Sequence, residues 1–152
     1  MHETAIVDAS ALIALEKIEL LDILCKLYHQ IILTDAVINE FGTPTIECYS
    51  IRKVKSPMVK LLLNESNLGK GEAEVIALAS ETGIRMIVDD LKARKVAETL
   101  NLNLTGTIGV LLKAEKLQLI DSAYDKTKEL RDKGFRVSDQ LLDKISEFKI
   151  SV

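Results

Sequence analysis

Short apolar runs alternate along the chain with longer segments whose apolar residues recur at helical spacing. The runs at 4–8, 30–34, 85–89 and 102–105 are short and rich in β-branched residues, which is typical of buried strands. Leu12, Leu15 and Ile18 follow the first run three or four residues apart and predict a helix over 9–18. By the same criterion, further helices are predicted at 19–28, 35–41, about 72–82, 91–100, 107–118, 122–134 and 138–150.

Glycine, proline and helix-capping residues support several of these boundaries. Gly42 and Pro44 end the helix at 35–41, and Gly83 ends the one that begins near Glu72. Ser138 is predicted to cap the last helix. Residues 45–60 have no clear pattern, because Pro57 interrupts any long helix there, and 59–64 is predicted as a strand in preference to a helix end.

This order of elements predicts the fold class. Strands separated by helices imply right-handed crossovers and a parallel sheet covered on both faces. We therefore expect an α/β protein, a three-layer α/β/α sandwich with a central parallel sheet of four to five strands and a helical C-terminus. No linker or internal repeat divides residues 1–152, so a single domain is expected.

Composition excludes some classes of protein. The 152 residues are 47% hydrophobic and 28% charged, which is ordinary for a soluble domain, and no apolar run approaches the ~20 residues of a membrane helix. The N-terminus lacks the pattern of a signal peptide, so a cytoplasmic location is expected. Cys25 and Cys48 are isolated and are predicted to be reduced thiols. The net charge of −3 means that any nucleic acid must bind to a local basic patch.

Acidic residues occur where the predicted strands end. Asp8 follows Ile6 and Val7, and the adjacent Asp89 and Asp90 follow the run at 85–88. Active sites in open parallel sheets lie beyond the carboxyl ends of the strands, so these carboxylates converge if their strands are neighbours. Glu40 and Glu72, from two further segments, could join them. Four carboxylates held together need a cation, and oxygen ligands without histidine suit Mg²⁺ or Mn²⁺.

Each acid also has a simpler interpretation. Asp8 and Asp90 can be helix N-caps, and Glu72 or Glu74 can be first-turn residues that favour the helix dipole. Glu40 alone is typical of a solvated helix face. The set as a whole favours a metal site, because chance rarely ends two strands of one sheet in Asp.

Four segments carry a resemblance that covers residues 4 to about 145. They are "IVDASALIALEKIELLDIL", "DAVINEF", "GKGEAEVIALASETGIRMIVDDLKARKVAETLNLNLTGTIGVLLKAEK" and "GFRVSDQLL". The chain resembles PIN-domain proteins, in particular the small prokaryotic branch of predicted nucleic-acid-binding proteins once grouped as a domain of unknown function. The resemblance implies a single-stranded RNA endonuclease with a Mg²⁺ or Mn²⁺ site of three or four acids, and many relatives are toxins of toxin–antitoxin pairs.

The resemblance also implies roles for single residues. The acids that match the family pattern, as catalytic residues and metal ligands, are Asp8, Glu40, Glu72 and Asp89, with Asp90 as a further metal ligand. Ser10, Glu74, Arg94 and Thr107 match supporting positions. Many PIN nucleases have a threonine or serine and then an acid two places on after this strand, whereas "VDDLK" offers adjacent acids. Which of Asp89 and Asp90, and which of Glu72 and Glu74, binds metal therefore stays open.

Gly106 is expected to make a turn, with Thr107 as the cap of the following helix. Arg94 can stabilise charge on a phosphate or form a salt bridge with Asp90. The segment "GKG" lacks the rest of a phosphate-binding loop, and "GTIG" has no basic residue to support a KH-type RNA site.

RNA is expected to bind through its phosphates, because the chain has three Phe, three Tyr and no Trp for base stacking. The candidate RNA-binding residues are Arg52, Lys53, Lys55, Lys92 and Lys95, with Lys60 close to the first three. The expected partners are single-stranded RNA, an antitoxin protein and a second copy of the chain. The homodimer is expected to form through the three closing helices, whose first member is rich in Val, Leu and Ile. The alternative is a PIN-like module that binds RNA or protein without turnover.

Overall fold

Five parallel strands form one sheet at the centre of the protein. The structure, a computed structural model, describes residues 3–151. Its strands are β1 (Thr4–Val7), β2 (Gln30–Thr34), β3 (Tyr49–Arg52), β4 (Arg85–Ile87) and β5 (Leu104–Thr105). They are hydrogen-bonded in the order β3-β2-β1-β4-β5, and every pair is parallel. The predicted parallel sheet is confirmed, with five strands.

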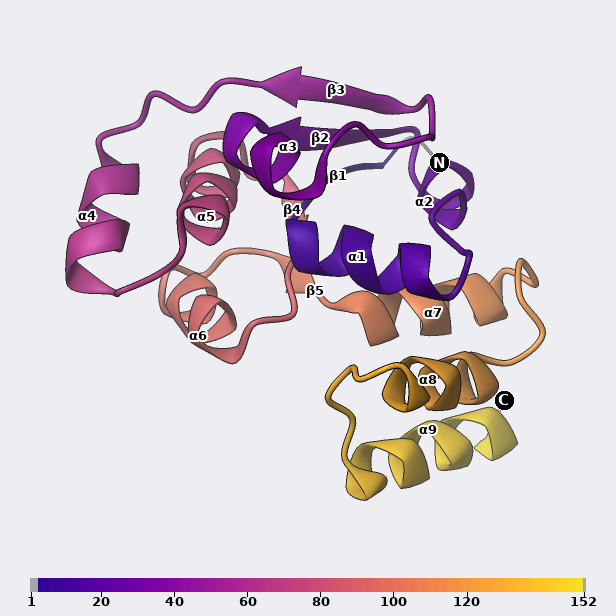
Figure 1. Cartoon of the computed structure of the whole chain (residues 1–152). Helices are drawn as coiled ribbons and strands as arrows, with labels where there is room; N and C mark the ends of the chain where they lie inside the picture. The colour runs from indigo at the N-terminus through magenta and orange to yellow at the C-terminus, as the bar shows by residue number, and fades with distance from the viewer. Residues whose placement is uncertain (1–2, 152) are drawn as a thin grey trace.

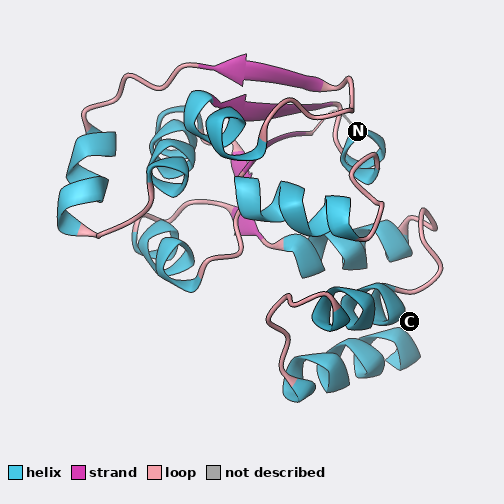
Figure 2. Ribbon diagram, viewed as in Figure 1, coloured by secondary structure: helices cyan, strands magenta, loops and turns pink. Residues whose placement is uncertain are grey.

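Helices cover both faces of this sheet (Figures 1 and 2). They are α1 (Ala9–Lys17), α2 (Ile23–Leu27), α3 (Asp35–Phe41), α4 (Met58–Glu65), α5 (Lys70–Thr82), α6 (Leu91–Thr99), α7 (Thr107–Lys116), α8 (Ala123–Asp132) and α9 (Asp139–Ser151). The α7 helix packs on α1 and α2, whereas α4 and α6 pack on α5. The β1–β2 and β3–β4 crossovers run in opposite directions across the sheet, so right-handed connections put these two groups on opposite faces. The three-layer α/β/α prediction is therefore confirmed.

Burial explains why the first strand lies in the middle of the sheet. Ala5, Ile6 and Val7 have no solvent exposure, since helices cover both faces of the central strand. Its neighbours, β2 and β4, contribute equally buried apolar side chains, including Ile31 and Ile87. Among the described helices, none has the length and apolar character needed to cross a membrane.

The predicted strand at 59–64 is wrong, because this segment is the α4 helix. Val59, Leu62 and Leu63 pack against the core at helical spacing, while Leu61 is 58% exposed. Pro57 occupies the N-cap position of α4, so it begins a helix where the sequence suggested an interruption. The missing strand is β3, within the segment that had no clear pattern. It is an edge strand whose four side chains are all at least partly exposed, which removes the apolar signal.

The prediction of two reduced thiols is also wrong. Cys25 and Cys48 form a disulfide, with a Cα–Cα distance of 5.6 Å. Sequence spacing did not reveal the pair because tertiary structure brings it together. Cys25 lies in α2, which packs on β2, and the N–H of Ile31 in β2 donates to the Cys48 carbonyl oxygen at 2.9 Å. The disulfide therefore ties α2 to the edge of the sheet.

The apolar surface of α7 is largely buried within the chain. Val110 and Leu111 are at most 1% exposed, and Ala114 is fully buried. Beyond the helix, Leu117 is 54% and Leu119 37% exposed. The homodimer stays a prediction, and less of this helix is left to form an interface than its sequence suggested.

Reduction of the disulfide is expected to destabilise the protein by about 3 kcal/mol, because the unfolded chain loses a cross-link that spans 23 residues. Urea unfolding with and without a phosphine reductant measures the difference. The Cys25→Ser/Cys48→Ser variant is the control and should show no effect of reductant. An unchanged free energy of unfolding, with both thiols shown to be free by mass spectrometry, would contradict the expectation.

Candidate metal and nucleic-acid site

The first feature of the site is the place where the strand order reverses. The chain leaves β1 toward β2 and β3, then crosses back to β4 on the other side of β1. The Asp8 N–H donates to the Ile87 carbonyl oxygen at 3.0 Å, so the carboxyl ends of β1 and β4 are directly joined. Asp8 and Asp89 consequently lie on the same edge of the sheet, at the kind of switch point where α/β proteins bind ligands.

Asp8 is the buried acid of this edge. Its side chain is 3% exposed, and burial raises the pKa of its carboxyl from 3.8 to about 7. The charges of Glu72 and Glu40 raise this pKa further, while the Ala9 N–H and the Ser10 hydroxyl lower it. Ser10 Oγ donates to Asp8 Oδ2 over a long 3.4 Å. Asp8 occupies the N-cap position of α1 but makes no side-chain cap hydrogen bond, so helix capping does not explain this buried carboxyl.

Glu40 reaches the same point from the last turn of α3. A Cβ atom placed on Gly71 would lie 3.4 Å from Asp8 Oδ1 and 3.5 Å from Glu40 Oε1. Both carboxylate oxygens therefore lie beside this residue without a side chain. Asp8, Glu40 and Glu72 come from three separate segments, and the charges of the two glutamates act on Asp8; these three residues are called the acid cluster below. Metal binding by them stays a prediction.

Glu72 and Glu74 have different surroundings. Glu72 Oε1 accepts a hydrogen bond from the Gly69 N–H at 3.0 Å at the start of α5, and Glu72 also borders the groove described below. Glu74 is 6% exposed and its Oε1 accepts the Ala36 N–H at 3.0 Å, at the start of α3. In this geometry Glu72 is the member of the acid cluster, and Glu74 stabilises the N-terminus of α3.

Asp89 holds the beginning of α7. Its Oδ1 accepts the Thr107 N–H at 2.8 Å, and its Oδ2 accepts the Thr107 hydroxyl at 2.5 Å. The prediction that Thr107 caps α7 is wrong: Gly106 has the N-cap position, and the Asp89 carboxylate supplies the acceptor. A Cβ atom on Gly106 would lie only 2.8 Å from Asp89 Oδ1 and 2.7 Å from Arg94 Nη1, so a side chain at this position would displace both groups.

The side chains of Asp90 and Arg94, close to Asp89, form hydrogen bonds with backbone groups. Asp90 accepts the Ala93 N–H at 3.0 Å, which confirms it as the N-cap of α6. Arg94 Nη1 donates to the Val88 carbonyl oxygen at 3.0 Å, and within residues 3–151 it forms no ion pair with Asp90. Two carboxylates can therefore follow β4 because each of them accepts hydrogen bonds at the start of a different helix.

A groove of about 910 Å³ lies beside Glu72, Asp89 and Asp90, whereas Asp8 and Glu40 are not among the residues that line it. Its lining residues are Ser10, Glu72, Asp89, Asp90, Leu91, Arg94, Thr105, Gly106, Ile108, Gly109, Phe135, Arg136, Ser138 and Leu141. The last four come from the loop between α8 and α9 and the start of α9, and the sequence analysis gave none of them a place in the site. The signal available was an aromatic and a basic residue directly after Gly134, in a segment that resembles the family.

The predicted RNA-binding residues lie outside this groove. Arg52, Lys53 and Lys55 are exposed at and beyond the end of β3, and Lys60 is exposed on α4. Lys92 and Lys95 are exposed on α6. Since β3 is parallel to β1, its basic end lies on the same edge of the sheet as Asp8.

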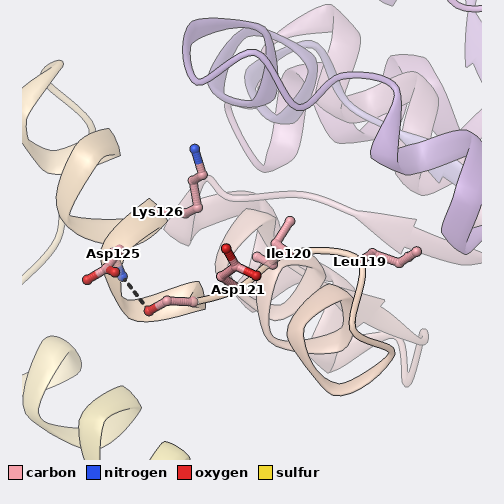
Figure 3. A pocket seen from close by; sticks show the side chains of 6 residues that line it. Leu119, Ile120, Asp121, Asp125 and Lys126 are labelled. Atoms are coloured by element: carbon pink, nitrogen blue, oxygen red, sulfur yellow. Dashed lines mark hydrogen bonds between the residues drawn. The ribbon is translucent and has the colours of Figure 1, made fainter.

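A smaller hollow between α7 and α8 is unrelated to the acids (Figure 3). It is lined by Leu119, Ile120, Asp121, Ser122, Asp125 and Lys126. Ser122 Oγ accepts the Asp125 N–H at 3.0 Å, which is an ordinary N-cap of α8.

The sequence model of the PIN-domain family matches residues 4–148. The chain belongs to the PIN-domain family. PIN domains are generally nucleases and typically use divalent metal ions. No curated protein matches the chain.

The donor set of this PIN domain fits a hard divalent cation. Asp8, Glu40 and Glu72 offer carboxylate oxygens only, which suit Mg²⁺ or Mn²⁺. Across the part of the chain that the structure describes, no three or more His, Cys, Asp or Glu residues are arranged as a metal site. The fit therefore rests on the chemistry of the donors and on the shared space beside Gly71.

The raised pKa of Asp8 predicts how stability depends on pH without metal. Folded Asp8 keeps its proton up to about pH 7 and unfolded Asp8 only to about 3.8, so stability falls as the pH rises between these values. From pH 5 to pH 8, the wild type should lose roughly 2–3 kcal/mol that Asp8→Asn retains. Urea unfolding of both proteins in EDTA at the two pH values measures this. Parallel pH profiles for both proteins would show that Asp8 is ionised normally.

Proposed function

We propose that this PIN domain is a Mg²⁺- or Mn²⁺-dependent endoribonuclease that cleaves single-stranded RNA. One observation carries the proposal: the buried carboxyl of Asp8 lies with Glu40 beside Gly71, where the charges of Glu40 and Glu72 act on it, and it makes no side-chain cap hydrogen bond in α1. Burying a carboxyl beside two others costs stability in the free protein. A cation that offsets this repulsion gives the arrangement a function.

The roles of the residues follow from their positions. Asp8, Glu40 and Glu72 would hold the cation, and Asp89, which is fixed by Thr107, borders the same groove. A bound divalent cation would neutralise the acids and polarise the phosphate and the attacking water. A carboxylate beside such a cation would accept the proton of the attacking water, and Arg94 would stabilise charge that develops on the phosphate.

RNA would bind by its phosphates, because the chain offers exposed cations and few aromatic rings. Arg52, Lys53, Lys55, Lys92 and Lys95 are all exposed and unhindered by burial. The net charge of −3 confines this attraction to local patches, so binding should weaken steeply as salt is added.

The cellular role follows only from the resemblance. The chain would be the toxin of a toxin–antitoxin pair, with an antitoxin protein as partner, acting in the cytoplasm as a homodimer. The Cys25–Cys48 disulfide is more typical of an oxidising compartment, so the cytoplasmic location stays a prediction.

A second candidate function has an observation in its favour. Glu72 and Asp89 already accept hydrogen bonds at the starts of α5 and α7, and the Asp90 carboxylate does so at α6. A chain in which these acids serve only as caps would be a module that binds RNA or protein without turnover. Cleavage assays distinguish the two functions.

Asp8→Asn is expected to lower the rate of RNA cleavage at least a hundredfold. The substitution keeps the shape of the side chain but removes an anionic oxygen from the cation, and such electrostatic help is worth several kcal/mol. The measurement is cleavage of labelled single-stranded RNA by wild type and variant in Mn²⁺, with EDTA as the blank. A range of RNA sequences is needed, since the target is not specified by the fold.

Asp132→Asn is the matched control. Asp132 is an exposed acid at the end of α8, and its change to Asn alters the net charge equally without touching the cluster. This variant should cleave like the wild type. Equal cleavage by Asp8→Asn and wild type would refute the assignment of Asp8. Cleavage by the wild type in EDTA would refute the metal dependence, and absent cleavage by the wild type would favour the binding module.

A further inference from the structure

One wall of the groove is made by a segment that takes no part in the acid cluster. The first wall carries Glu72, Asp89, Asp90 and Arg94, and the second comes from the α8–α9 loop and the start of α9. Arg136 is the only cationic residue among the groove-lining residues of this second wall. A strand that lies along this groove would therefore contact Glu72, Asp89 or Asp90 on one wall and Arg136 on the other.

The loop that carries Arg136 makes contacts at both of its ends. Phe135 packs against the core and its N–H donates to the Leu130 carbonyl oxygen at 2.9 Å. Arg131 Nη1 pairs with Asp139 Oδ1 at 2.7 Å, which joins the end of α8 to the start of α9. Ser138 accepts the Leu141 N–H at 3.1 Å and confirms its predicted role as the cap of α9. Arg136 is thus presented at the groove by a loop that is anchored on both sides.

The guanidinium of Arg136 has no partner among the described side chains of residues 3–147 or the backbone of residues 3–151. Arg85 pairs with Glu3, Arg94 donates to Val88, and Arg131 pairs with Asp139. Arg136 is exposed and makes no hydrogen bond or ion pair with a described residue, although three carboxylates line the same groove. A planar group with five N–H donors is left available for an anion that enters the groove.

We propose that Arg136 is a substrate-binding residue that holds a phosphate of the single-stranded RNA lying along this groove. The proposal rests on the proposed function, because it assumes that RNA reaches the acid cluster. The acids and Arg136 then have different roles. The acids would hold the cation next to the phosphate that is cleaved, and Arg136 binds a different phosphate of the same strand and so positions the strand. An acidic peptide could use the same guanidinium, and the test below separates it from RNA.

The test measures RNA binding without cleavage. Fluorescence anisotropy of a labelled twelve-nucleotide single-stranded RNA is recorded with the full chain in EDTA, at several salt concentrations. Arg136→Gln should weaken binding about fivefold at 0.1 M salt and reduce the salt dependence by about 0.7 in the log–log slope, as expected for one lost phosphate contact. Arg136→Lys should restore most of the affinity and the slope, since an ammonium also binds phosphate.

Lys144→Gln is the matched control, because Lys144 is an exposed cation of α9 that does not line the groove. It removes the same charge and should bind RNA like the wild type. Equal weakening by Lys144→Gln and Arg136→Gln, or no weakening by either, would overturn the proposal, as would a wild type that binds no RNA or only an acidic peptide. The Mn²⁺ cleavage assay tests the proposed function separately. If the wild type cleaves RNA but its RNA affinity does not depend on Arg136, only this inference is refuted.

Discussion

The hydrogen bond from the Asp8 N–H to the Ile87 carbonyl oxygen joins β1 to β4 at the point where the strand order reverses. This pairing fixes the carboxyl ends of two strands that are far apart in sequence, and the rest of the site is arranged around it. The α5 helix, which packs against β1, β2 and β4, then brings Gly71 and Glu72 next to Asp8. If β1 and β4 were not neighbours, Asp8 and Asp89 would not follow adjacent strands of the sheet.

Two glycines lie against the acids. A Cβ atom on Gly71 would be in ordinary contact with Asp8 and Glu40, whereas one on Gly106 would displace Asp89 and Arg94. Asp8 and Asp89 differ in the hydrogen bonds that stabilise their negative charge. Asp89 accepts two hydrogen bonds from Thr107, whereas Asp8 is buried with a raised pKa and a single long side-chain hydrogen bond from Ser10. The repulsion that a cation would relieve is therefore concentrated at Asp8.

Much of this architecture could be predicted from the sequence, because the apolar pattern is strong where elements are buried. The boundaries of α3 and the end of α5 at Gly83 were expected, and so was the meeting of Asp8 with Asp89 on one edge. The predictions that were wrong concern features that depend on tertiary contacts. An exposed edge strand has no regular pattern of apolar residues, so β3 was missed. The segment of α4 was taken for a strand because its packing on α5 is a tertiary contact that the sequence does not show.

Sequence patterns also did not reveal contacts between residues that are far apart in the chain. The Cys25–Cys48 disulfide depends on how α2 packs on the sheet, and the hydrogen bonds of Asp89 depend on a helix that begins 18 residues later. Arg136 was missed because a lone arginine in a loop has no periodicity and becomes informative only when the groove is seen.

The central claim is that the carboxylates of Asp8 and Glu40 share a divalent cation. Diffraction from crystals soaked in MnCl₂, with data collected above the manganese absorption edge, tests it directly. The account predicts an anomalous peak beside Gly71, with carboxylate oxygens of Asp8 and Glu40 at roughly 2.0 to 2.6 Å from the ion. A well-occupied manganese elsewhere on the protein, with no peak between these two side chains, would contradict it.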